Sequence, residues 1–76
     1  MAGALTARRR ALAVLVEFPT STRISNTTDR DAHHVYWQSA DWLVAQGHAR
    51  RAIGDQGYNR LELTTEGDAF ARGEGL

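Results

Sequence analysis

The sequence predicts an α+β fold in one domain spanning residues 1–76, because helical and strand-like patterns occupy separate parts of the chain. With 76 residues, the chain is long enough for a single small domain. Apolar side chains recur at helical spacing in residues 6–18 and again in residues 31–46. Two strand-like runs flank "GDQG", residues 54–57, which is typical of a β-hairpin turn.

The first predicted helix covers residues 6–18. Thr6 can cap its amino end, and Pro19 ends it because proline disfavours a helical conformation in the residue before it. Arg8 to Arg10 point about 100° apart, so we interpret them as a solvated first turn, with phosphate contact as the alternative. The side chains expected on the stripe that faces the core are Leu5, Leu12, Leu15 and Val16.

Residues 19–31 are rich in Ser, Thr, Asn and Asp, which favour turns and helix caps. A short extended piece at residues 22–24 and a helix of one or two turns at residues 25–30 fit this composition best. Ile24 is the sizeable apolar side chain of the segment, so we expect it to enter the core.

The second predicted helix runs from a cap at Asp31 to Gln46, with Gly47 as its stop. A helical wheel gathers one wide apolar arc that we expect to be buried, and a polar side that we expect to face solvent. Val35 and Trp42 form a third patch, either packed on neighbouring elements or exposed as an anchor for a partner protein. The buried arc contains Tyr36, Trp37, Ala40, Leu43 and Val44, and the solvent side contains His34, Gln38, Asp41 and Ala45.

A hairpin is predicted across residues 48–64, followed by a short helix. Apolar and polar side chains alternate in residues 58–64, which is the period of a half-buried strand. Thr64 or Thr65 can cap the helix that follows. Phe70 is the side chain expected to anchor this helix to the rest of the domain.

Two stretches carry a resemblance to a known family. "LVAQGHARR", residues 43–51, leads from a helix through a glycine into a strand, and "RLELTTEGDAFA", residues 60–71, leads from the hairpin into a capped helix. Their order and spacing resemble the winged helix-turn-helix domain of bacterial transcriptional regulators, such as the MarR and PadR groups, over residues 6–72. The resemblance implies three main helices, a two- to three-stranded wing sheet and a short C-terminal helix. It also implies that residues 25–30 begin the helix-turn-helix and that residues 54–57 form the wing tip.

The resemblance implies double-stranded DNA as the partner, with the helix 32–46 in the major groove and the wing on the backbone. The free side of this helix departs from the family's pattern, because it carries no Arg or Lys and because Asp41 repels phosphate. Gln38 can pair with adenine and His34 can donate to guanine, while a homodimer would double the contacts. The residues expected at base edges are His34, Gln38 and Ser39, and those expected at phosphates are Arg23, Arg30, Arg50, Arg51 and Arg60.

The charge balance supports an alternative function. The nine basic and nine acidic residues cancel, whereas a dedicated nucleic-acid binder is usually basic. A winged-helix scaffold used for protein–protein interaction tolerates this neutrality, and Val35 with Trp42 would then belong to its interface. The sequence therefore predicts a DNA-binding transcriptional regulator, with a protein interaction module as the alternative.

The sequence predicts no catalytic activity, cofactor or metal site. There is no cysteine, and the three histidines show no His-x-x-x-His spacing, so no metal ligand set is expected. No nucleophile elbow surrounds Ser39, and a chain of this size has little room for a pocket, so we expect neither an enzyme nor a small-molecule substrate. The apolar run at residues 11–16 is too short to cross a bilayer and no cleavage site follows it, which predicts no membrane partner and a cytoplasmic location.

Overall fold

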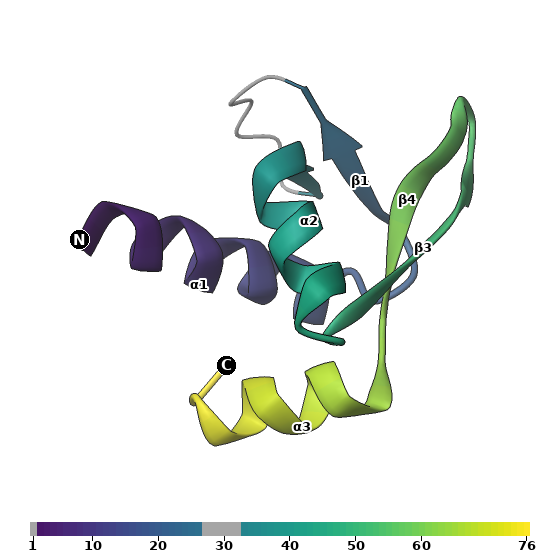
Figure 1. Ribbon diagram of the computed structural model, residues 1–76. Coiled ribbons are helices and arrows are strands. Elements are labelled where there is room, and N and C mark those ends of the chain that lie inside the picture. The colour runs from purple at the N-terminus through teal and green to yellow at the C-terminus, as the bar shows by residue number, and fades with distance from the viewer. Residues whose placement is uncertain (1, 27–32) are drawn as a thin grey trace.

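The computed structural model describes residues 2–26 and 33–76, and this part of the chain contains three helices and four strands (Figure 1). The predicted α+β fold is confirmed, with a mixed sheet of four strands where two or three were expected. Of the helix predicted at residues 25–30, Ser25 belongs to a strand and residues 27–32 lie outside the described part. The elements in chain order are α1 (Ala2–Glu17), β1 (Thr22–Ser25), β2 (His34–Tyr36), α2 (Trp37–Ala45), β3 (Ala49–Gly54), β4 (Gly57–Leu63) and α3 (Thr65–Gly73).

Strand β1 lies inside the sheet, whose strand order is β2-β1-β4-β3. It pairs in parallel with β2, which places Ile24 opposite Val35, and antiparallel with β4, which places Thr22 opposite Leu61. Strands β3 and β4 form the predicted hairpin, and the pairing between β1 and β4 stops at Arg23. The outer half of the hairpin therefore projects beyond the other strands, as Figure 1 shows.

Glycines with positive φ precede and follow β3. Gly47 follows Gln46, the C-terminal cap of α2, and has a φ of 78°, and Gly57 lies at the hairpin turn with a φ of 89°. Side chains disfavour this region of backbone conformation, whereas glycine enters it without steric cost. Gly47 as the stop of the second helix and residues 54–57 as the hairpin turn are both confirmed.

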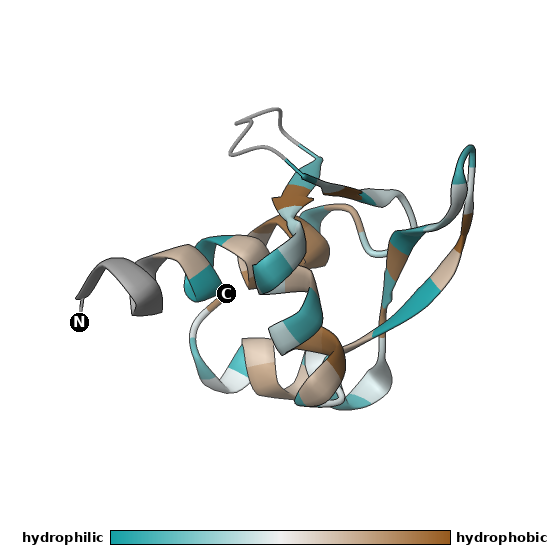
Figure 2. Cartoon of the chain, turned by 45° about the horizontal axis from the view of Figure 1, so that its top comes forward, coloured by the Kyte–Doolittle hydropathy of each residue, from teal (hydrophilic) through white to brown (hydrophobic). Residues whose placement is uncertain are grey.

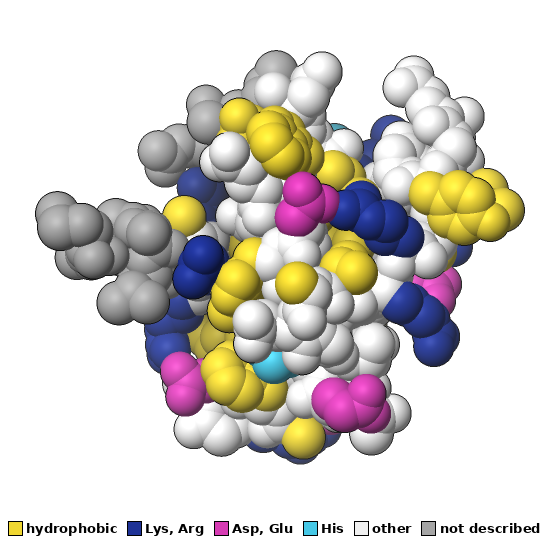
Figure 3. All heavy atoms as spheres, in the orientation of Figure 1, with side chains coloured by type: hydrophobic (Ala, Val, Ile, Leu, Met, Phe, Trp, Pro, Cys, Tyr) yellow, Lys and Arg dark blue, Asp and Glu magenta, His cyan; other side chains and the backbone are white. Residues whose placement is uncertain are grey.

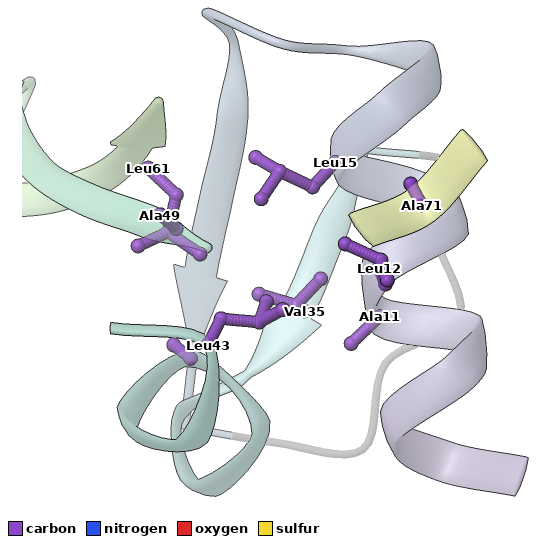
Figure 4. Packing of buried hydrophobic residues seen from close by; sticks show 9 residues of the cluster. Ala11, Leu12, Leu15, Val35, Leu43, Ala49, Leu61 and Ala71 are labelled. Atoms are coloured by element: carbon purple, nitrogen blue, oxygen red, sulfur yellow. The ribbon is translucent and has the colours of Figure 1, made fainter. Parts of the chain in front are cut away.

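The core lies between the sheet and the helices, and its largest fully buried apolar side chains are leucines (Figure 4). Leu12 and Leu15 come from α1, Leu43 comes from α2 and Leu61 comes from β4. Burying one leucine contributes roughly 1.5–3 kcal/mol, so this cluster outweighs any single polar contact. Figure 2 shows hydrophobic parts of the helices and strands meeting in the middle of the molecule, while the hairpin tip is hydrophilic.

Helix α1 is longer than predicted, because it begins at Ala2 instead of Thr6 and ends at Glu17. Leu12 and Leu15 are buried at the predicted helical spacing. No helix in the described part of the chain is both long and apolar enough to cross a membrane.

The second helix is shorter than predicted. Helix α2 begins at Trp37, because the three residues before it form β2. Tyr36 is extended, with φ of −67° and ψ of 146°, and Val35 is buried with 4% of its surface exposed. The helical wheel was wrong for these residues, because side chains on a strand alternate between two faces instead of rotating by about 100° per residue. Trp37, which the wheel placed in the core, is 43% exposed, whereas Ala40 and Leu43 are buried as predicted.

Thr64 joins the start of α3 to the end of α2. Its hydroxyl donates to the Gly47 carbonyl at 2.6 Å and accepts the Gly67 N–H at 2.9 Å, so the capping role predicted for Thr64 is confirmed. Gly67 lies so close to the backbone of His48 that a Cβ at this position would collide with the His48 carbonyl. This close approach fixes α3 beside the residues that link α2 to β3.

The substitution Gly67→Ala should destabilise the fold by about 1–3 kcal/mol, because the added methyl group forces the His48 backbone away from α3. Gly73→Ala is a matched control in the same helix, since a Cβ at Gly73 meets no atom within 4 Å. The control should raise stability by about 0.4–1 kcal/mol. Urea unfolding followed by circular dichroism measures both, and equal effects of the two substitutions would contradict the close packing at Gly67.

Candidate nucleic-acid interface

The side of α2 that faces away from the core carries polar side chains. Ala40 and Leu43 are buried, while Gln38 and Asp41 on the other side are exposed, as the helical wheel predicts. These two positions are three residues apart, so their side chains lie one above the other on the helix. Ser39 is half-buried and belongs only to the border of this surface.

Arg51 extends this surface from α2 to the hairpin. Its guanidinium donates to the Asp41 carboxylate, and the two side chains are 38% and 52% exposed. Arg51 lies opposite Leu61 in the β3–β4 register, and directly opposite residues point to the same face of a sheet. Because Leu61 is fully buried, Arg51 lies at the edge of the face that packs on the helices. In Figure 3 an acidic and a basic side chain touch near the centre of this view.

The other predicted phosphate contacts lie on the opposite face of the sheet. Arg60 is adjacent to the buried Leu61 along β4 and so points away from the core, and Arg23 lies directly opposite Arg60 on β1. Arg50 lies opposite Glu62 on this same outer face. The sheet therefore separates Arg51 from Arg23, Arg50 and Arg60, the other arginines expected at phosphates. Arg30 lies outside the described residues.

His34 also lies away from the surface of α2. It belongs to β2, where it is the register partner of Arg23, and its side chain is half-buried. The prediction that His34 projects from the second helix beside Gln38 is wrong, because strand pairing with β1 holds its backbone extended. The rings of His33 and His34 stack with centroids 4.9 Å apart at the turn that leads into β2.

The outer face of the sheet holds a network of paired charges. Arg23 and Arg60 are like charges directly opposite each other, which destabilises a sheet unless acidic groups offset them. Asp55 at the hairpin tip accepts from Arg23 at 2.7 Å, and Glu62 accepts from both Arg50 and Arg60 at 3.0 Å. The hydrogen bond from Arg50, followed by that from Arg60, lowers the pKa of Glu62 below its ordinary value of 4.5.

Carboxylates thus accompany every predicted phosphate contact that the structure describes. A phosphate must compete with Asp41 for Arg51 and with Asp55 or Glu62 for the arginines of the outer face. The pairs of Arg23 with Asp55 and of Arg51 with Asp41 are exposed, so each is weak enough to be exchanged for another anion, whereas the pair of Arg60 with Glu62 is partly buried. The surface therefore supplies arginine side chains with a defined geometry but little net positive charge.

A hollow of about 430 Å³ lies between the hairpin tip, the end of β1 and the start of α2. Its lining includes Arg23, Asp55 and Asn59, with the indole of Trp37 at one side. The sequence analysis missed Trp37 as a surface residue because the wheel assumed a helix that begins before it. The exposed ring places an apolar, flat group beside the polar surface of α2.

The predicted patch of Val35 and Trp42 does not form. Val35 points into the core from β2, so it is not available to a partner. Trp42 is half-buried and contacts other elements: the Arg8 guanidinium lies 5.2 Å from its ring centroid, and the His48 ring lies edge-on at 5.5 Å. Trp42 therefore belongs to a separate surface beside α1.

Comparison with known proteins finds no family model, no curated protein and no solved structure that matches this chain. The winged helix-turn-helix resemblance therefore depends on the two sequence stretches that suggested it. The surfaces of the molecule have to supply the evidence for function.

The lowered pKa of Glu62 predicts a pH dependence of stability. A carboxylate whose pKa is lower in the folded state stabilises the fold above its unfolded-state pKa, and this contribution is lost as the pH falls through the folded-state value. Glu62→Gln should therefore lower Tm by a few degrees at neutral pH and weaken the decline of Tm below about pH 4.5. Thermal melts across this range measure both effects.

Glu17→Gln is the control for this experiment, because Glu17 is exposed and forms no ion pair within the described residues. It should change the acid limb of the stability curve little. A Glu62→Gln protein with the wild-type pH profile would show that the arginine contacts do not stabilise the carboxylate.

Proposed function

We propose that this protein binds double-stranded DNA with the exposed side of α2 and the hairpin beside it, as a transcriptional regulator without catalytic activity. The observation that carries the proposal is the continuous exposed surface formed by Gln38, Asp41 and Arg51. A helix of ordinary diameter fits the major groove of B-DNA, which is about 12 Å wide. The projecting hairpin next to it has the shape required to reach the DNA backbone (Figure 1).

The side chains of this surface suit base edges better than phosphates. Gln38 can form two hydrogen bonds with adenine, and Arg51 can form two with guanine. The Asp41 carboxylate repels phosphate but can accept from the amino group of cytosine. Its contact with Arg51 also restricts the guanidinium to one region of the surface, which reduces the entropy lost when a base is bound.

The paired arginines set the expected strength of binding. Affinity for DNA of any sequence grows with the number of phosphates neutralised, and here the arginines are already balanced by carboxylates. We therefore infer a weak nonspecific component that is detectable at low salt. Base contacts then account for a larger share of the total affinity than in a strongly basic domain.

A protein partner is the second candidate. The specific observation in its favour is a set of exposed apolar side chains around the hairpin and the start of α2, namely Trp37, Ile53 and Tyr58, which are 43%, 63% and 66% exposed. Aromatic side chains of this kind dominate the energy of many protein interfaces. Salt distinguishes the two candidates, because DNA binding weakens steeply with added salt and binding through apolar contacts does not.

Asp41→Asn should strengthen binding to duplex DNA at low salt by roughly three- to tenfold, because removing one negative charge beside a phosphate is worth on the order of 1 kcal/mol. Fluorescence anisotropy with labelled random-sequence duplexes measures the change. Asp68→Asn is the matched control, since it frees Arg72 from an equivalent ion pair on α3, away from the proposed surface. A similar gain in DNA affinity from both substitutions would show that the gain comes from the change in net charge and not from the position of Asp41.

Arg51→Ala should weaken binding to a duplex selected from a random pool by about 1–3 kcal/mol, the usual cost of losing a two-bond contact with guanine. Arg72→Ala removes the same charge from α3 and should leave the affinity within a factor of about two. The absence of any DNA complex at low salt for the wild-type chain would exclude the proposal in favour of a protein partner.

A further inference from the structure

The hollow between the hairpin tip, the end of β1 and the start of α2 has the size of a small-molecule site. Its volume is about 430 Å³, and ligand pockets in proteins usually occupy about 300–1,000 Å³. Arg23 on β1 donates to Asp55 at 2.7 Å, so this ion pair holds the hairpin tip beside the strand at one side of the hollow. The two charges offset each other, which favours a ligand group that is polar but uncharged.

Trp37 gives the hollow a flat apolar wall. It is the first residue of α2, and 43% of its surface is exposed. The ring of Tyr36 lies beside it, with centroids 5.7 Å apart, and limits the positions that the indole can take. An exposed indole offers a face on which a second planar ring can stack, and every nucleobase has such a face.

Side-chain amides line other parts of the hollow. Asn26, Gln56 and Asn59 belong to its lining, and none of these three side chains forms a hydrogen bond with another described residue. The Oδ1 atom of Asn59 is buried and has no hydrogen-bond donor, so the fold does not fix this amide. An amide carries both donors and an acceptor, and asparagine or glutamine can pair with adenine through two hydrogen bonds.

The lining distinguishes between classes of ligand. An acyl chain would stack poorly and would leave the amides without partners. An anion such as phosphate would have to displace Asp55 from Arg23. A planar polar ring system satisfies the indole face and the amides together and leaves the ion pair in place. A purine covers more of an indole face than a pyrimidine does, because both have two fused rings.

We propose that this hollow binds a purine base, held by stacking on Trp37 and by hydrogen bonds with Gln56 and Asn59. The base can belong to a free nucleotide or to DNA in which it is unpaired, since a paired base inside a duplex does not present its face or its pairing edge. The free nucleotide is independent of DNA binding. The DNA source rests on the proposed function, because Trp37 is adjacent to Gln38 at the start of the proposed DNA surface.

Nuclear magnetic resonance with adenosine monophosphate tests the site. The chain has two tryptophans, and Trp42 lines a different, apolar hollow that contains Phe70 and lies between α1, α2 and α3. The nucleotide should shift the indole N–H signal of Trp37 and leave that of Trp42 unchanged. Ribose 5-phosphate, which lacks the base, should shift neither signal.

Substitutions of two exposed rings measure the contribution of stacking. Trp37→Ala should raise the dissociation constant for adenosine monophosphate at least about fivefold, because the base loses the ring on which it stacks. Tyr58→Ala is the matched control, since it removes an exposed ring of the hairpin that does not line the hollow, and it should leave the constant unchanged. Circular dichroism checks that both variants are folded.

A comparison of two duplexes identifies the source of the base. If the base belongs to DNA, a duplex with one unpaired adenine should bind more tightly than the same duplex fully paired, and Trp37→Ala should remove the difference. Equal binding of the two duplexes, together with the nucleotide-induced shift at Trp37, assigns the hollow to a free nucleotide.

The inference is overturned by either of two results. One is the absence of both a shift at Trp37 with adenosine or guanosine monophosphate and a preference for the unpaired adenine. The other is an equal shift with ribose 5-phosphate. The proposed function is decided separately, by Arg51→Ala on fully paired DNA. A chain that binds the nucleotide but no duplex keeps this site and loses that function, and a chain that binds only paired DNA through Arg51 does the reverse.

Discussion

The rest of the structure depends on the burial of Leu61, which lies in β4 and packs in the apolar core. Leu61 belongs to the same buried cluster as Leu12, Leu15 and Leu43, so one strand position is packed with both α1 and α2. Its register neighbours are constrained at the same time, because Thr22 lies opposite it on one side and Arg51 on the other. Shifting β4 by one residue would turn every side chain of the strand to the other face and expose this leucine.

The same register decides where the arginines lie. With Leu61 directed to the core, Arg60 and Glu62 must point outward, and their partners Arg23 and Arg50 follow them. Arg51 is the exception, because it shares the face of Leu61 and meets Asp41 on α2. The packing of one apolar residue thus divides the basic side chains into an outer network and a single arginine beside the helix.

The proposed DNA surface and the apolar hollow beside α1 use different parts of the molecule. The surface of Gln38 and Arg51 lies between α2 and the hairpin, whereas the hollow that contains Phe70 lies between α1 and α3. Helix α2 takes part in both, through different sides.

Local chemistry in the sequence determined the hairpin, its glycine turn, the helix stop at Gly47 and the cap at Thr64, because each depends on residues only a few positions apart. The buried stripes of α1 and α2 also follow from helical spacing. Only the tertiary structure decided that residues 34–36 form a strand, since the partner that holds them extended is β1, about ten residues earlier in the chain. That distant pairing buries Val35, exposes Trp37 and removes His34 from the helix. The periodicity of residues 31–46 contains no information about a pairing with another segment of the chain.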